Sequence, residues 1–520
     1  MADRVELAQN AAARAVPSMV NGKPQIPYLG IGKYQPRVRK QAPPVRSSKD
    51  YPENGDKRLP DLETALRKCG LRDGMVVSNH HHLRDGDKVA LRMLEAAAKI
   101  GVKDLLWFPS ASFPSQKSAI DLMEKDVIHH IEGSMNGPLG DYCTQGKMRG
   151  MGVLRSHGGR WQAIQDGEVH IDIAVIAAPT ADLFGNADGS HGKSACGSLG
   201  FALADSTYAD HVIVVTDNLV PFPCVPWQIQ GNNVDYVVEV DSIGDPAKIV
   251  SGTTQITRSP DRLRIAEFVA RFLRDAGIME NGFSFQAGAG GIALAFVDYL
   301  RRLMKEDGVR ARFVRGGSTK YLVELLQEGL TDYILDGQTF DLDGVKSIAG
   351  DPRHIATSPF TSYNYHGKGN FASMVDAVVL GATEVDVHFN ANVVTHSDGR
   401  LLHGIGGWQN CLFSGCSILA VPSFRDRIPV IVDEVTTLTG PGEMIDVVAT
   451  ERGIAINPLR KDLLDAVKGS RLPIRPIEDI KSEVEQICGG KPARPKLGDR
   501  PVAVVKWVDG TVLDTVWQVG

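Results

Sequence analysis

An internal repeat constrains the fold of this chain more than any other feature of its sequence. Four segments of the first half recur in the same order in the second half, at offsets of roughly 200 to 220 residues. The matched pairs are 88–112 with 292–318, 126–133 with 330–337, 172–189 with 385–399, and 211–219 with 429–438. One such match would mean little, but four in order indicate two halves of similar design.

Both halves have the alternating strand and helix pattern of an α/β fold. Apolar runs of the kind found in buried parallel strands are Met75–Val77, Asp104–Phe108, Ile171–Ala177, His211–Val215 and Val234–Val240. Apolar positions at helical spacing predict helices over Lys88–Ile100 and Ser115–Glu124. Strands that alternate with helices imply βαβ units, so we expect two similar α/β domains.

Chain length and one polar stretch indicate where these domains divide. A chain of 520 residues is too long for a single hydrophobic core. The polar stretch 250–262 contains Pro260 and separates the two repeats. We therefore predict a first domain over 61–255 and a second over 256–520, with ligands bound where the two meet.

The ends of the chain differ from the two halves, and residues 1–60 form a separate N-terminal region. Residues 2–15 are rich in alanine and predict a short helix. Residues 17–60 hold eight Pro, nine Lys or Arg and three Asp or Glu, which predicts either an extended packed arm or a solvated linker. Near the other end, the β-rich runs 502–508 and 511–516 flank an Asp-Gly pair, which predicts a C-terminal β-hairpin.

Composition argues against several classes of protein. A net charge of −5, from 57 basic and 62 acidic residues, gives no broad surface for nucleic acid. The seven cysteines are scattered without a CxxC pair, which is typical of reduced thiols and not of disulfides or cysteine-rich zinc sites. Because no apolar stretch has the length of a signal peptide or a membrane span, we expect a cytoplasmic protein that does not bind membranes.

A Gly-rich loop, Gln286–Gly291, lies between an apolar run and the first helix of the second half. Gly288, Gly290 and Gly291 would let the backbone approach a ligand, and the helix that follows would offer free N–H groups to an anion. No GxGxxG occurs there and no GxxxxGK[ST] occurs anywhere, so the usual nucleotide fingerprints are missing. A tight strand–helix turn is the alternative interpretation.

A second Gly-rich loop spans His403–Asn410. Gly404, Gly406 and Gly407 could direct several backbone N–H groups at one oxygen, which is what an oxyanion hole requires. A β-bulge or a tight corner would have the same composition.

Three consecutive histidines follow the first strand predicted in the first half, within Ser78–Asp87. At the end of a strand, His81, His82 and Arg84 could hold carboxylates, or each could be structural. Adjacent histidines do not converge on one ion, and no ligand at zinc spacing lies nearby, so we predict no metal site.

Together these features resemble the coenzyme A transferase superfamily, whose Gly-x-Gly-Gly oxyanion loop corresponds to 404–407. More narrowly, four segments resemble the citrate lyase alpha subunit family, and the likeness extends over nearly the whole chain. The segments are SNHHHLRDGD (78–87), APTADLFGNADG (178–189), VVTDNLVPFP (214–223) and GDRPVAVVKWVDGTVLDTVWQV (498–519).

The resemblance implies two CoA-transferase-like α/β domains and an acyl-exchange reaction. An acetyl thioester reacts with citrate, so that acetate leaves and a citryl thioester forms. The thiol belongs to CoA or to the CoA-like prosthetic group of a γ (acyl-carrier) subunit, and no cofactor is bound covalently to this chain. A β (lyase) subunit then cleaves the citryl group, and this chain itself is expected to form a homo-oligomer.

The sequence departs from the superfamily at one position. Many CoA transferases use a glutamate nucleophile in a stretch that corresponds to Phe313–Tyr321, which here contains no Glu or Asp; the nearest is Glu324. The resemblance therefore implies direct attack by citrate through a mixed anhydride, with no glutamyl intermediate. The implied roles are the oxyanion hole for Gly404, Gly406 and Gly407, the thioester cradle for Gly288, Gly290 and Gly291, and citrate binding for His81, His82, Arg84 and Ser318.

Two other functions stay open at this level. The same chemistry could act on another hydroxy acid, such as citramalate. Alternatively, the fold could dock a carrier protein without catalysing a reaction.

Overall fold

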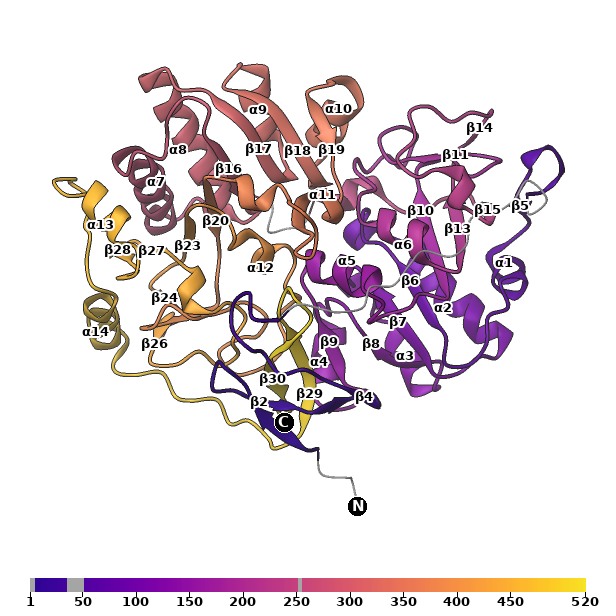
Figure 1. The fold of residues 1–520 in the computed structure, drawn as a ribbon, viewed down its shortest axis with the longest axis horizontal. Coiled ribbons are helices and arrows are strands. Elements are labelled where there is room, and N and C mark those ends of the chain that lie inside the picture. The colour runs from indigo at the N-terminus through magenta and orange to yellow at the C-terminus, as the bar shows by residue number, and fades with distance from the viewer. Residues whose placement is uncertain (1–4, 35–50, 251–254) are drawn as a thin grey trace.

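The structure, a computed structural model, describes residues 5–34, 51–250 and 255–520. Two large and mostly parallel sheets dominate it, one from each half of the chain (Figure 1). The first sheet has seven strands in the order β5-β15-β13-β10-β6-β7-β8, and the second has eight in the order β19-β18-β17-β16-β20-β23-β27-β28. The α/β class predicted from the sequence is confirmed.

The strands and helices predicted in the first half are confirmed. The strands of its sheet are β5 (Arg58–Leu59), β6 (Val76–Asn79), β7 (Leu105–Pro109), β8 (Ile128–Ile131), β10 (Ile173–Ala178), β13 (His211–Thr216) and β15 (Tyr236–Glu239). Helices α2 (Val89–Ile100) and α3 (Ala119–Glu124) connect successive strands. Strand β10 is buried over its whole length, as expected for a parallel strand covered on both faces. Helix α2 ends where Gly101 takes a left-handed conformation, with φ of 94°.

The second half repeats this architecture. Its sheet contains β16 (Ser284–Ala287), β17 (Ala311–Ser318), β18 (Thr331–Thr339), β19 (His354–Ala356), β20 (Ala377–Leu380), β23 (Ser417–Ala420), β27 (Val447–Thr450) and β28 (Gly453–Ile456). Only β28 runs antiparallel to its neighbour. Helices that pack on this sheet include α7 (Pro260–Asp275), α8 (Gly291–Asp307), α9 (Lys320–Gln327) and α10 (Leu342–Gly350).

The repeat extends to individual hydrogen bonds. Each half has a small three-stranded sheet in which a tight turn follows an aspartate, Asp182 in one and Asp386 in the other. In the first half, Asn186 accepts a hydrogen bond from the N–H of Gly231 at 2.9 Å. In the second half, Asn390 accepts the same bond from the N–H of Gly442, also at 2.9 Å. This agreement supports the repeat found in the sequence.

The helix predicted over residues 2–15 is wrong. Residues 5–34 contain instead the antiparallel pair β1 (Leu7–Gln9) and β2 (Ala15–Pro17). The side chain of Asn10 closes the turn by accepting from the N–H groups of Ala12 and Arg14 at 3.0 Å. Val16 packs in an apolar cluster with Val512, so tertiary contacts outweigh the helical propensity of the alanines.

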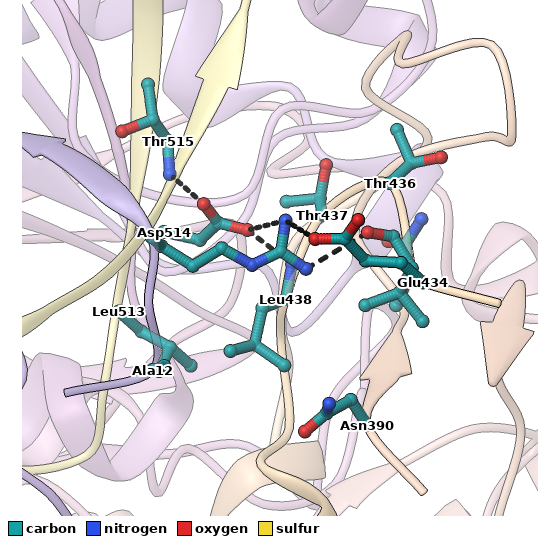
Figure 2. A network of polar contacts seen from close by, with 12 residues as sticks. Ala12, Asn390, Glu434, Thr436, Thr437, Leu438, Leu513, Asp514 and Thr515 are labelled. Atoms are coloured by element: carbon teal, nitrogen blue, oxygen red, sulfur yellow. Dashed lines mark hydrogen bonds and ion pairs between the residues drawn. The ribbon is translucent and has the colours of Figure 1, made fainter. Parts of the chain in front are cut away.

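The arm continues along the C-terminal strands up to residue 34 and is partly packed, with exposed residues such as Leu29 next to buried ones. Tyr28 is buried and donates its backbone N–H to the carbonyl of Val512 at 2.9 Å. Arg14 donates to the carbonyl of Val435 at 3.0 Å and lies 3.7 Å from Asp514. Figure 2 shows the carboxylates of Asp514 and Glu434 on either side of the guanidinium that interacts with both. Residues 35–50 of the predicted arm lie outside the described part.

The C-terminal strands join the two halves. Strand β29 (Pro501–Lys506) pairs antiparallel with β30 (Val512–Trp517) and parallel with β9 (Gly152–Leu154) of the first half. These strands lie below the junction of the two sheets in Figure 1. The largest apolar cluster accordingly includes Ile176 from the first half, Trp408 from the second and Trp507 from the C-terminal region.

A buried group of charges fixes these strands to the first half. The ammonium of Lys506 donates to Glu168 at 2.9 Å and to Gln25 of the arm at 2.6 Å. Glu168 also pairs with Arg155, which in turn pairs with Glu132. Within the described ranges, no helix combines the length and apolar character needed to cross a membrane.

Candidate functional site

The two sheets bring the carboxyl ends of their strands together at the junction of the halves. His81 follows β6, Ser110 follows β7, and Gln338 lies near the end of β18. Ring atom Nδ1 of His81 lies 2.6 Å from the hydroxyl of Ser110, and Nε2 lies 3.1 Å from the amide oxygen of Gln338. The side chain of Gln338 also donates to the carbonyl of His81 at 3.3 Å. The predicted histidines therefore lie at the contact between the halves.

The second Gly-rich loop is held against the first half by its backbone. The N–H of His157, at the start of α5 (His157–Gln165), donates to the carbonyl of Gly406 at 2.8 Å. The next N–H, of Gly158, donates to the side chain of Asn410 at 3.0 Å. Among described residues, the N–H groups of Gly404 and Gly407 donate to no other protein atom. Two backbone donors of this loop therefore have no partner in the described part of the chain, as an oxyanion hole requires.

The glycines of this loop have little room for a side chain. A Cβ at Gly404 would lie 1.8 Å from the hydroxyl of Ser134, and one at Gly407 would lie 2.8 Å from the hydroxyl of Tyr363. Gly406 has space around it but a φ of +64°, which disfavours residues with a side chain. Close packing and backbone conformation thus explain why glycine occupies all three positions.

The first Gly-rich loop lies close to the second, and Tyr363 bridges them. Gln286 donates to the hydroxyl of Tyr363 at 3.4 Å, and that hydroxyl packs on Gly407. Gly288, Gly290 and Gly291 line a cavity of about 250 Å³ at the start of α8. The same cavity is lined by Gly381, whose carbonyl accepts from the indole of Trp408 at 2.8 Å. The structure therefore places both loops in one region.

Two arginines reach this region from opposite halves. Arg84 is half-buried, with φ of 51°, and its guanidinium lies 4.6 Å from the ring centre of Phe340. Burial lowers the pKa of Arg84 to about 10. Arg315, on β17, is fully buried and donates to Gln286 at 2.6 Å. Its guanidinium lies 4.7 Å from the ring centre of Tyr363.

The histidines around the junction are neutral at physiological pH. Burial lowers the pKa of His157 to about 3 and that of His80 to about 4. Burial also holds the pKa values of His81 and His82 well below the usual range. Nε2 of His82 is buried and has no hydrogen-bond partner among the described residues. His82 can therefore bind a carboxylate by hydrogen bonding, without a permanent charge, and His81 can do so in exchange for its hydrogen bond to Gln338.

Ser318 and Glu324, which were also considered from the sequence, already interact with neighbouring side chains. The hydroxyl of Ser318 donates to Asp336 at 2.5 Å, in a buried group that includes His354. Glu324 is 40% exposed on α9 and lies 3.5 Å from Arg301 of helix α8. Its side chain therefore faces helix α8 and solvent.

One group of potential metal ligands occurs elsewhere. His170, Asp172 and Asp210 lie at the amino-terminal ends of β10 and β13. The Gly-rich loops lie at the opposite, carboxyl ends of the strands. In the described part of the chain this is the one cluster of its kind, and it takes no part in the site.

Sequence reasoning missed four residues that shape the site: His157, Gln338, Arg315 and Tyr363. Arg315 had a detectable signal, because a charged residue stands between apolar residues and two glycines in Phe313-Val-Arg-Gly-Gly. Tyr363, in α11 (Pro359–Tyr363), belongs to no recognisable motif. Its importance follows only from its place between the two loops.

Comparison with known proteins agrees with this geometry. The family described as citrate lyase, alpha subunit, matches residues 56–519. The citrate lyase alpha chain of Klebsiella pneumoniae is 37% identical over 497 residues, which cover 95% of this chain and 96% of the relative. That of Escherichia coli K12 is 38% identical over 461 residues, which cover 88% and 90%.

Solved structures give the same result. A crystal structure of a citrate lyase alpha subunit from Streptococcus mutans in complex with citrate matches with a TM-score of 0.92 and 38% identity, covering 98% of this chain and 100% of that one. The alpha subunit of a malonate decarboxylase from Acinetobacter baumannii shares the fold at a TM-score of 0.60, with 18% identity and coverage of 82% and 92%. The resemblance found in the sequence is confirmed: the chain belongs to the citrate lyase alpha subunit family.

Proposed function

We propose that this chain is the transferase subunit of a citrate lyase, which moves a carrier thiol from an acetyl group to citrate. The observation that carries the proposal is the second Gly-rich loop, which is fixed to the first half by the His157–Gly406 hydrogen bond and has backbone donors at Gly404 and Gly407 that no described residue uses. Such donors stabilise the oxyanion of acyl transfer. Family membership supports citrate as the acceptor.

The reaction has two acyl-transfer steps. A citrate carboxylate adds to the carbonyl of the acetyl thioester, and the resulting oxyanion collapses to acetyl-citryl anhydride with release of the thiolate. The thiolate then adds to the citryl carbonyl, and this second oxyanion collapses to the citryl thioester with release of acetate. Both steps need the same oxyanion donors and the exclusion of water, because the anhydride would hydrolyse.

The predicted site residues other than Ser318 each have a role in this scheme. Gly404, Gly406 and Gly407 form the oxyanion hole. Gly288, Gly290 and Gly291 cradle the pantetheine arm in the cavity at the start of α8, where Arg262 and Arg425 also line the wall. His81, His82 and Arg84 bind citrate. The structure gives no support to Ser318 as a citrate ligand, because its hydroxyl already donates to Asp336.

Citrate acts in this scheme without a nucleophile from the protein. The stretch that would carry a glutamate has none, and Glu324 pairs with Arg301 outside the site. Buried carboxylates near the junction already have partners: Asp205 pairs with Arg160, and Asp336 accepts from Ser318. These contacts support direct attack by citrate.

The proposal also covers the carrier, the other subunits and the location of the reaction. The carrier is CoA or the CoA-like prosthetic group of a γ subunit, a β subunit cleaves the citryl thioester, and the chain works as a homo-oligomer in the cytoplasm. Two CoA-transferase-like domains, 61–255 and 256–520, supply the two sides of the site. The C-terminal strands 501–517 extend from the second domain to pair with β9 of the first.

An exchange assay tests the function. Acetyl-CoA and a panel of hydroxy acids, including citrate and citramalate, are incubated with the chain, and acyl-CoA products are measured. We expect citryl-CoA and acetate in equal amounts. A scaffold that only docks a carrier protein would form no acyl-CoA product with any acceptor.

A further inference from the structure

Two guanidinium groups at the site lack the carboxylate partner that buried arginines elsewhere in the chain have. Arg155 pairs with Glu132 and Glu168, and Arg160 pairs with Asp205. Arg84 and Arg315 form no ion pair with any carboxylate in 5–34, 51–250 or 255–520. For Arg84 the atoms Nε and Nη1, and for Arg315 the atoms Nε and Nη2, are inaccessible to solvent and have no hydrogen-bond partner there.

The neighbours of Arg315 orient its guanidinium but do not neutralise it. Gln286 accepts one hydrogen bond from Nη1 at 2.6 Å, and the ring of Tyr363 lies against the guanidinium. Neither neighbour carries a negative charge, because burial raises the pKa of Tyr363 to about 12. The guanidinium of Arg315 thus has no anionic neighbour among these contacts, and two of its donor atoms are unused.

Arg84 reaches the same strand end from the other half. The ring of Phe340, on which Arg84 stacks, fills the position of a Cβ at Gly317, with a ring carbon 1.4 Å from that position. Gly317 lies two residues after Arg315 on β17. The adjacent carboxylate of Asp85 accepts from the N–H of Ser115 at 3.0 Å and makes no ion pair with the guanidinium.

A buried charge without a partner destabilises a fold unless a ligand supplies the opposite charge. Guanidinium groups bind carboxylates through two parallel hydrogen bonds, for which two free donor atoms are needed. Arg315 has two such atoms on one edge of its guanidinium, Nε and Nη2, whereas Arg84 has Nε and Nη1 on different edges, each able to donate singly. Because one guanidinium comes from each half of the chain, the pair indicates a ligand with two carboxylates to hold.

We propose that Arg84 and Arg315 each hold one carboxylate of the acceptor that does not react, so that the site selects an acceptor with three carboxylates. This inference rests on the proposed function. In citrate one carboxylate attacks the thioester and two remain, one for each arginine. In citramalate one attacks and only one remains, so one guanidinium stays buried and unpaired. A site built to bind a group discriminates strongly against an analogue that lacks it.

The test compares two acceptors in the wild type and four variants of the full chain. Exchange from acetyl-CoA is measured with citrate and with citramalate for the wild type, Arg84→Met, Arg315→Met and Arg312→Met. Arg312 is the matched control, because it lies on the same strand and is exposed. Thermal unfolding of each variant shows whether it is folded, and Arg315→Lys shows whether charge without the paired donors is enough.

We expect Arg84→Met and Arg315→Met each to lower kcat/KM for citrate by at least about 30-fold, the effect of removing one partner of a buried charge pair. In one of these two variants the citrate-to-citramalate ratio of kcat/KM should also fall by a similar factor. The arginine replaced in that variant is the one that binds the second carboxymethyl group. Arg312→Met should leave both values unchanged, and Arg315→Lys should recover only part of the loss.

Two results would overturn the inference while leaving the transferase function intact. One is a wild type that uses citrate and citramalate equally well. The other is a pair of folded methionine variants whose citrate-to-citramalate ratio equals that of the wild type. A wild type that forms no acyl-CoA with either acceptor would instead contradict the proposed function itself.

Discussion

The backbone N–H of His157 donates to the carbonyl oxygen of Gly406 at 2.8 Å, across the junction between the two halves of the chain. This bond fixes the oxyanion loop of the second half to the first turn of α5 in the first half. Glycine restricts the backbone conformation little. The position of the loop therefore depends on this contact and on the packing of Tyr363 against Gly407.

Gly407→Ala should therefore slow acyl exchange. Its Cβ would lie 2.8 Å from the hydroxyl of Tyr363, so the loop must move away from the oxyanion. Loss of one oxyanion donor lowers the rate by about 10²–10³. Steady-state exchange with saturating citrate measures the effect, and Gly350→Ala is the control, because a Cβ there has open space. If Gly407→Ala folds and keeps the wild-type rate, the loop has no part in the mechanism.

Stability should fall in mild acid because of the buried histidines. The folded-state pKa of His157, about 3, lies below the unfolded value of about 6.5. The unfolded chain therefore binds the proton first, and stability that is present above pH 6.5 is lost as the pH falls toward 3. His157→Gln should reduce this loss by roughly 1 kcal/mol per pH unit below pH 6.

Melting temperatures between pH 7.5 and 5 measure this dependence. His191→Gln is the matched control, because the side chain of His191 is half exposed. Equal slopes for wild type and His157→Gln would show that His157 is not held neutral by the fold.

Lys506→Met should destabilise the chain and loosen the N-terminal arm. Burial would raise the pKa of Glu168, but Arg155 and Lys506 lower it to about 2. Without Lys506 the carboxylate loses one of its cations, and Gln25 loses its bond to the C-terminal strand. We expect a loss of about 3 kcal/mol in the free energy of unfolding, as for other broken buried pairs.

Urea unfolding measures that loss, and limited proteolysis should show earlier cleavage within 17–34. The double variant Lys506→Met with Glu168→Gln provides the internal check. The double variant should lose less free energy of unfolding than the sum of the losses in Lys506→Met and Glu168→Gln, because it leaves no unpaired charge. Strict additivity would mean that the two side chains do not interact.

The sequence predicted the regular parts of this fold well because they follow local periodicity. Buried runs such as Ile171–Ala177 can be recognised as strands without knowing their neighbours, and the repeat predicted that the second half would follow the first. The helix over 2–15 failed because β2, which pairs with β1, packs against residues about 500 positions away, which no local pattern records.

The site was predicted only where composition was unusual. The Gly-rich loops were found, and the structure places them together through Tyr363. Arg315 was missed because its strand was considered only for a nucleophilic carboxylate, which it lacks. The pairing of β29 with β9 depends on residues about 350 positions apart, and no spacing rule predicts it. Which atoms touch citrate stays a prediction.

The final prediction concerns the order of the chemical steps. If citrate attacks the thioester directly, donor and acceptor must occupy the site together, so initial-rate plots should intersect. A glutamyl enzyme would give the parallel plots of a ping-pong mechanism. Incubation with acetyl-CoA alone should also leave the protein mass unchanged and give nothing for hydroxylamine or borohydride to trap.

Glu324→Gln separates the two mechanisms at the residue level. Glu324 is 40% exposed and 3.5 Å from Arg301, so its loss should cost less than about 1 kcal/mol of stability and leave exchange within about twofold of the wild type. A nucleophilic Glu324 would instead make the variant inactive. The described carboxylates Asp205 and Asp336 are already paired, so neither of these two is free to replace it. A mass-detected acyl or thioester adduct on any Glu or Asp after incubation with acetyl-CoA alone would rule out direct attack, even if Glu324→Gln stayed active.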